Sequence, residues 1–253
     1  MFGWLRQRRE AQALQRHAIP DDLWQRTLAL YPFLSKRSEA DLVELRRLSS
    51  LFLASKEFHG AAGFEVSDNV ALAVAAQACL PILKLGLAWY DGFVGIVMHA
   101  DEVVAERSWQ DEDGIVHEYD EALAGEAMEG GPLMLSWQAV AESEGAREPG
   151  AVFNVVIHEF AHVIDMRDGL ADGVPLLTSH AAREEWLGVV EPVWQRFCRR
   201  ADRGGASVID AYGAESLAEF FAVASEAFFV APEALKKEQP ALYRLLSGFY
   251  QQD

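Results

Sequence analysis

The sequence predicts an α+β fold, in which a mainly helical single domain carries a small mixed sheet. Apolar residues recur at helical intervals in the first third of the chain and again after residue 150. Between residues 88 and 140, short β-branched and aromatic segments alternate with Asp-Gly and Gly-Gly turns, which is typical of strands. Hydrophobic residues make up 51% of the 253 residues, so the chain can bury a large core.

We expect one domain over residues 1–253, because no repeat or linker divides the sequence. Its expected parts are an N-terminal helical part at about 20–87, the small sheet at 88–140, a second helical part at 150–230 and a C-terminal helix at 231–253.

Residues 20–57 are expected to be helical. The segment Ile19-Pro20-Asp21-Asp22 is a good helix start, and Pro32 is expected to separate two helices. The glycines of residues 58–66 indicate a looser segment. The alanine-rich residues 69–83 are nearly all apolar, which predicts a buried helix.

The strands are expected at residues 94–98, 102–105, 116–119 and 132–137. Asp91-Gly92, Asp113-Gly114 and Gly130-Gly131 supply the turns that separate them. Because Pro132 begins the last strand and proline donates no hydrogen bond, we expect residues 132–137 to form an edge strand.

After the sheet, the pattern predicts loops and helices in alternation. Residues 142–149 and 167–175 are polar or rich in turn residues, so we expect loops there. The expected helices cover about 150–166, 181–200, 216–230 and 232–250.

Composition excludes several classes of protein. The formal net charge of −17 argues against a nucleic-acid partner, because phosphate binding needs clustered Lys and Arg. Cys79 and Cys198 are far apart, so neither a disulfide framework nor a cysteine-type zinc site is indicated. No apolar stretch is long enough for a secretory signal or a membrane span, and we expect a cytoplasmic protein without a membrane partner.

A short motif on the helix at 150–166 carries metal chemistry. In His158-Glu159-Phe160-Ala161-His162 the two histidines are four residues apart, so a helix presents both on one face. Two such imidazoles can bind zinc, and Glu159 can then act as general base on a water molecule that the metal activates. The alternative is a pair of core histidines with hydrogen-bond partners.

The composition of the helix favours metal binding over a pair of core histidines. Apart from Asn154 and Asp165, which share the face of the histidines, the helix is apolar around most of its circumference and is therefore expected to be buried. Burying two histidines and a glutamate costs free energy unless something satisfies them. The extended pattern with a third histidine is absent, because Asp168 stands at that position.

Catalytic zinc takes three protein ligands, so a carboxylate from a later helix is expected. Glu219, Glu226 and Glu215 are the candidates. Ser216 and Glu219 also match a capping box, in which the glutamate would bond back to the helix start. Glu226 could instead orient a ligand histidine. Spacing leaves these alternatives open.

The motif HEFAH followed by YGAESLAEFFA resembles the gluzincin catalytic domain of anthrax lethal factor. The chain resembles more fully, over most of its length, the Mlc titration factor A family of bacterial metallopeptidases. The segments that carry this resemblance are Gly131–Trp137, Asn154–Met166, Tyr212–Ala222 and Phe249–Gln252.

The resemblance implies a gluzincin-type metallopeptidase with one Zn²⁺ per chain. It implies that His158, His162 and Glu219 bind the metal, that Glu159 is the general base and that Tyr212 stabilises the transition state. From their own pattern, residues 133–137 are expected, as an edge strand, to border the active site and to pair with the peptide substrate; the alternative is an ordinary sheet edge. Asp165 is expected either to orient a ligand histidine or to end its helix.

The resemblance further implies aminopeptidase activity on short peptides, and binding to the glucose-responsive transcriptional repressor Mlc in enterobacteria. The second property makes a regulatory binding protein, with peptidase activity secondary, the alternative function. A third alternative is a structural zinc domain, which would unfold when a chelator removes the metal.

Overall fold

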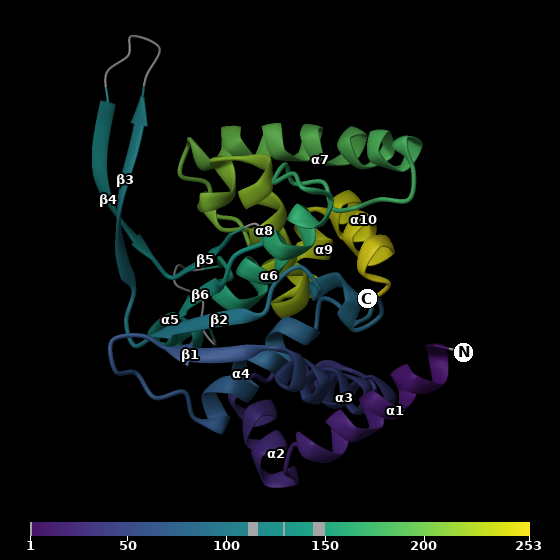
Figure 1. The fold of residues 1–253 in the computed structure, drawn as a ribbon. Helices are drawn as coiled ribbons and strands as arrows, with labels where there is room; N and C mark the ends of the chain where they lie inside the picture. The colour runs from purple at the N-terminus through teal and green to yellow at the C-terminus, as the bar shows by residue number, and fades with distance from the viewer. Residues whose placement is uncertain (1, 111–115, 129, 144–149) are drawn as a thin grey trace.

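The computed structural model describes residues 2–110, 116–128, 130–143 and 150–253, and Figure 1 shows their arrangement. The α-helices are α1 (Phe2–Arg16), α2 (Asp21–Leu30), α3 (Glu39–Ser55), α4 (Asp68–Cys79), α5 (Trp137–Glu142), α6 (Val155–Asp165), α7 (His180–Ala201), α8 (Leu217–Val230), α9 (Pro232–Glu238) and α10 (Pro240–Tyr250). The 3-10 helices are η1 (Leu34–Lys36), η2 (Leu87–Tyr90), η3 (Met166–Asp168) and η4 (Ala211–Ala214). The strands are β1 (Glu57–Gly60), β2 (Gly95–His99), β3 (Val103–Gln110), β4 (Val116–Leu123), β5 (Gly125–Ala127) and β6 (Leu133–Ser136).

The prediction of a mainly helical α+β fold with a small mixed sheet is confirmed. The main sheet has the strand order β1-β2-β6-β5. Strands β1, β2 and β6 run parallel, with Met98 paired to both Gly60 and Leu135, whereas β5 runs antiparallel to β6. Strands β3 and β4 form a separate antiparallel hairpin, which extends away from the helices in Figure 1.

The prediction that residues 132–137 form an edge strand is wrong. Strand β6 lies inside the sheet, between β2 and β5, and the edge beside it belongs to β5. Pro132 precedes β6, so its missing N–H interrupts no strand pairing. The sequence of β5, Gly125-Glu126-Ala127, has no β-branched or aromatic residue and therefore gave no strand signal.

Other elements differ from the predicted boundaries. Residues 57–60, expected to be helical or loose, form β1, and α1 was not predicted. The strands predicted at 102–105 and 116–119 belong to the hairpin, and the expected Asp113-Gly114 turn lies outside the described residues, as does most of the loop expected at 142–149.

The helix that carries the histidine motif begins five residues later than predicted. The backbone of Asn154 is extended, and its side-chain oxygen accepts the N–H of Ile157 at 2.9 Å, so Asn154 caps α6 instead of lying on its face. The expected C-terminal helix is two helices, because Gln239 precedes a proline and takes a non-helical conformation.

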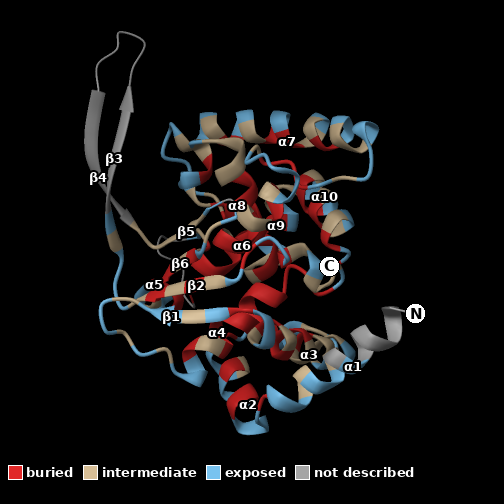
Figure 2. Cartoon of the chain, in the orientation of Figure 1, coloured by how far each residue is buried: buried red, intermediate tan, exposed pale blue. Residues whose placement is uncertain are grey.

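Buried residues concentrate in the helices at the centre of the molecule. Helices α4, α6 and α8 are buried along most of their length (Figure 2), and α6 contacts both of the others. No helix in the described part of the chain is both long and apolar enough to cross a membrane. That residues 1–253 form a single domain stays a prediction.

Candidate metal centre

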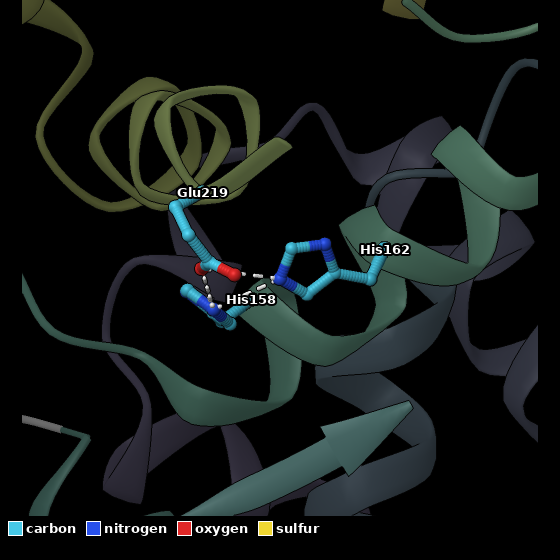
Figure 3. A group of neighbouring side chains, drawn as sticks. All are labelled: His158, His162 and Glu219. Carbon is cyan, nitrogen blue, oxygen red and sulfur yellow. Dashed lines mark hydrogen bonds and ion pairs between the residues drawn. The ribbon is translucent and has the colours of Figure 1, made fainter. Parts of the chain in front are cut away.

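Helices α6 and α8 bring three metal-ligating side chains together. The Nε2 atoms of His158 and His162 lie 3.2 Å apart, and Oε2 of Glu219 lies 3.1 Å from the first and 3.3 Å from the second. Figure 3 shows the carboxylate reaching from α8 toward both rings on α6. Residues 158, 162 and 219 are therefore adjacent in space although the last two are 57 positions apart in the sequence.

The local structure of α8 explains why Glu219 faces the histidines. Ser216 caps the helix, and its hydroxyl oxygen accepts the N–H of Glu219 at 3.1 Å. The Glu219 side chain lies against the imidazoles, where its carboxylate forms ion pairs with both rings. Only the serine half of the capping box is therefore observed, and the carboxylate is directed to the cluster.

The three residues fit a bound metal ion. Their ligand atoms all lie within 4.8 Å of one another, which is close enough for one ion to contact all three. Oε2 of Glu219 is buried and makes no hydrogen bond of normal geometry with the described residues, although the two nitrogens are close. Such an orphaned carboxylate oxygen is costly in the folded protein, and a divalent cation would satisfy it.

The two other carboxylates that the spacing allowed as ligands lie elsewhere. Glu226 lies behind His158, where Oε1 accepts a hydrogen bond from Nδ1 of the ring at 2.8 Å. Its Oε2 accepts the backbone N–H of Asn154. Glu226 is thus buried and bonded to the far side of the His158 imidazole, outside the cluster, whereas Glu215 is exposed and also outside it.

The charges in the site stabilise one another. Burial disfavours the charged form of Glu219, but its contacts with His158 and His162 outweigh burial and lower the pKa of the carboxyl to about 2. Burial likewise acts to lower the pKa of His158, but Glu219 and Glu226 on its two sides raise that pKa well above its usual value. In the absence of a cation these contacts favour a proton on His158, and a metal ion that bound at Nε2 would displace that proton while Glu226 still accepted the Nδ1–H.

Glu159 projects from α6 on the side of β5. It is 5% exposed, and burial raises the pKa of its carboxyl. A Cβ atom at Gly125 would lie 2.6 Å from Cγ and Oε1 of Glu159, so only glycine leaves room for the carboxylate here. Glu159 therefore occupies a fixed position between α6 and the edge of the sheet.

A cavity of about 310 Å³ opens beside these groups. Its lining includes His158, Glu159, Gly125 and Tyr212. The ring of Tyr212 lies 6.0 Å from that of His158 between centroids, and the residue is 40% exposed. Asp210, which sequence reasoning missed, accepts the backbone N–H of Tyr212 at 2.9 Å and fixes the start of η4.

Among the described residues, Asp165 makes no hydrogen bond to His158 or His162. It is the last residue of α6, and its Oδ2 accepts the N–H of Gly173 at 2.8 Å. Gly173 has a φ of +76°, and its Cα packs so closely on the carbonyl of Leu217 that a side chain would collide. Asp165 therefore ties the loop after α6 to the start of α8, close to Glu219.

Comparison with known proteins agrees with this site. The sequence profile of the glucose-regulated metallo-peptidase M90 family matches residues 4–251. The chain belongs to this family. The predicted resemblance to Mlc titration factor A is thereby confirmed, and membership of a metallopeptidase family implies a metal cofactor.

Curated members of the family match nearly the whole chain. Proteins named Mlc titration factor A are 37% identical over 235 residues in Cronobacter sakazakii and 35% identical over 241 residues in Escherichia coli O127:H6. A third, from Klebsiella pneumoniae, is 35% identical over 233 residues. Each alignment covers 91% of this chain and 86% of the relative, so this M90 chain shares most of its length with them.

Proposed function

We propose that this M90 chain is a zinc-dependent peptidase of the gluzincin type, with one Zn²⁺ held by His158, His162 and Glu219. The observation that carries the proposal is the convergence of two Nε2 atoms and one carboxylate oxygen beside the buried Glu159, in a chain of a metallopeptidase family. Two imidazoles and a carboxylate are a donor set that zinc prefers, and three protein ligands are typical of catalytic zinc.

When bound, zinc would act as a Lewis acid and lower the pKa of a coordinated water toward about 7. Glu159 would take up the proton of the attacking water and deliver it to the leaving amine. The raised pKa of Glu159 suits this role, because a base that is too acidic holds a proton poorly. Tyr212, at the mouth of the same cavity, would donate a hydrogen bond to the developing oxyanion.

We further propose that the edge strand at the active site is β5, in place of the strand at 132–137. Gly125 of β5 contacts Glu159, and β5 pairs with β6 on one side only among the described strands. An extended peptide could add to this open edge through main-chain hydrogen bonds. Its scissile bond would then lie next to the proposed general base.

Aminopeptidase activity on short peptides is the specificity that the family resemblance supports. A cytoplasmic location likewise stays a prediction. The relatives are named Mlc titration factor A, and this name supports a second candidate function. In it, the chain binds a transcriptional repressor of the Mlc type, and peptidase activity is secondary.

The substitution Glu159→Gln tests the proposed peptidase activity and the role of Glu159 as its general base. We expect zinc-loaded wild type to cleave a library of short peptides, and the variant to lose about 10²–10⁴-fold in kcat because the general base is gone. Metal analysis should still find one zinc per chain, because the three ligands are intact. Cleavage products are measured by mass spectrometry.

The matched control is Glu191→Gln, which makes the same change at an exposed position on α7 and should retain full activity. If zinc-loaded wild type cleaves no peptide, the proposal that the chain is a peptidase is contradicted, and the repressor-binding function is favoured. In that case both Glu159→Gln and wild type should bind an Mlc-type repressor equally in a pull-down with purified components.

A further inference from the structure

A second cavity lies farther along the same edge strand. It has a volume of about 270 Å³, and its lining includes residues of η2, β5, β6, α6 and η3. Ala127, at the end of β5, and Val163, one residue after the proposed ligand His162, form part of its wall. The cavity is distinct from the one that contains Glu159 and Tyr212, since the two have no lining residue in common.

The geometry of β5 and α6 relates the two cavities. Side chains of alternate strand residues point to the same face, so Gly125 and Ala127 both face α6. From Gly125 to Ala127 the strand advances roughly 6.6 Å, at about 3.3 Å per residue. From Glu159 to Val163 the helix advances roughly 6 Å, at about 1.5 Å per residue. Strand and helix therefore run side by side from the proposed base to the second cavity.

An extended peptide on β5 would cover the same distance with about two residues. A residue one or two positions from the bond that faces Glu159 would therefore place its side chain at the second cavity. The cavity continues the groove in which the peptide is proposed to lie.

The lining of the second cavity is mostly apolar. It includes Trp89, Phe93, Met128, Val163 and Met166, together with four glycines whose lack of side chains leaves the space open. Met128, at 50% exposed, leaves part of this apolar wall open to solvent. A volume of 270 Å³ is just below the about 300–1,000 Å³ of pockets that take whole drug-sized ligands, and suits a single large side chain.

One charged group completes the wall. Arg167, which is exposed, also lines the cavity. A lysine or arginine side chain that entered would meet a like charge in largely apolar surroundings, which is unfavourable.

We propose that this cavity is the specificity subsite of the peptidase, which selects substrates with leucine, methionine or phenylalanine one or two residues from the scissile bond. The inference rests on the proposed function, and it adds the class of peptide that the site accepts. Val163, on the helix side of the cavity, is expected to set the size of the accepted side chain.

Cleavage-site profiling with a randomised peptide library tests the subsite. Wild type should cleave leucine, methionine or phenylalanine peptides at least about tenfold faster in kcat/KM than alanine peptides at one position, because each buried carbon in an apolar pocket adds discrimination. Lysine should be the least favoured residue at that position. Val163→Phe fills the cavity and should abolish the preference, whereas Val163→Ala should shift it toward tryptophan.

Val43→Phe is the matched control, because Val43 is 67% exposed on α3 and far from the site in the sequence. It should leave the profile unchanged, and melting temperatures should show that all variants fold. Cleavage without a side-chain preference, or with a preference that both Val163 variants retain, would overturn the subsite and leave the proposed peptidase intact.

A binding measurement separates failure of the subsite from failure of the enzyme. If wild type cleaves nothing, calorimetry with Glu159→Gln compares a leucine peptide with its alanine counterpart. Binding that is at least about tenfold tighter for leucine, and lost in the Glu159→Gln, Val163→Phe double variant, would support the subsite without catalysis. Equal binding of both peptides would overturn it.

Discussion

Two carboxylates on one face of α8 contact opposite sides of the His158 imidazole ring. Glu219 and Glu226 are seven residues apart, which places them two turns apart on one face of the helix. The first contacts Nε2 of His158 and the second contacts Nδ1. The position of a single ring therefore depends on both, and only the carboxylate near Nε2 can share a metal with His162.

Glu226→Gln tests the role of the second carboxylate at the scale of one residue. Glutamine can still accept the Nδ1–H of His158, but its amide nitrogen cannot accept the N–H of Asn154 as Oε2 does. Loss of a charged partner behind a ligand histidine is expected to weaken zinc affinity by about 10–100-fold. Competition with a fluorescent chelator measures the affinity.

Glu215→Gln is the control for this experiment, since Glu215 is exposed and lies on the same segment outside the cluster. It should leave zinc affinity unchanged. Equal affinities for wild type and Glu226→Gln would show that the carboxylate does not orient the ligand.

At the scale of elements, the site depends on how closely α6 approaches β5. The approach requires a glycine, because Gly125 faces the Glu159 carboxylate without space for a methyl group. On the other side, the hydrogen bond between Asp165 and Gly173 fixes the loop that packs on the start of α8. The edge of β5, the proposed base Glu159 and the proposed third ligand Glu219 are thus positioned by contacts between elements rather than within them.

Gly125→Ala is expected to displace Glu159 while leaving the proposed metal ligands in place. Its added Cβ would lie 2.6 Å from the carboxylate, so the base must move by a substantial fraction of an ångström. Displacements of about 1 Å in an active site can cost roughly 10²-fold in rate. We therefore expect kcat to fall by about 10–100-fold with zinc content unchanged, as measured by steady-state kinetics and metal analysis.

Gly188→Ala provides the comparison, because a Cβ at this helical position of α7 meets no atom within 4 Å. Its kinetics should match those of wild type. A fully active Gly125→Ala variant would mean that the carboxylate adjusts freely or is not the base.

At the scale of the whole molecule, the proposed metal ligands adjoin an extensive apolar core. The described buried apolar residues form one cluster with members from α2, α4, α6, α8 and α10. Helix α4 alone buries nine residues of its twelve. A core of this extent is expected to keep the chain folded without a metal, unlike a zinc domain whose fold depends on the ion.

Chelation tests this expectation. A ligand at about a thousand times its dissociation constant stabilises the native state by about 4 kcal/mol. For a chain of this length, removal of the metal ion by the chelator should therefore lower the melting temperature by roughly 10 °C. The far-UV circular dichroism at 25 °C should stay helical.

His158→Ala, His162→Ala in one chain serves as the reference, since it should melt at the same temperature with and without chelator. Loss of the helical signal of wild type in chelator at 25 °C would instead identify a structural metal. That result would support the alternative in which His158, His162 and Glu219 hold a structural zinc ion.

The sequence by itself determined the elements that local physics controls. The period of apolar residues predicted the buried helix with His158 and His162, and the position of Pro32 predicted the break between α2 and α3, because both signals act within a few residues. Spacing also limited the third ligand to three carboxylates. It could not choose among them without the family resemblance, since Glu219 and Glu226 share a helix face.

Only the tertiary structure decided which residues lie next to the face of α8 that carries Glu219 and Glu226. It also decided which strand forms the edge of the sheet at the candidate site. The packing of α8 on α6 brings Glu219 to both histidines and places Glu226 behind one of them. The pairing of β5 with β6 converts an expected edge strand into an interior one. Both outcomes depend on contacts between residues far apart in the chain, and a sequence pattern of local period carries no information about them.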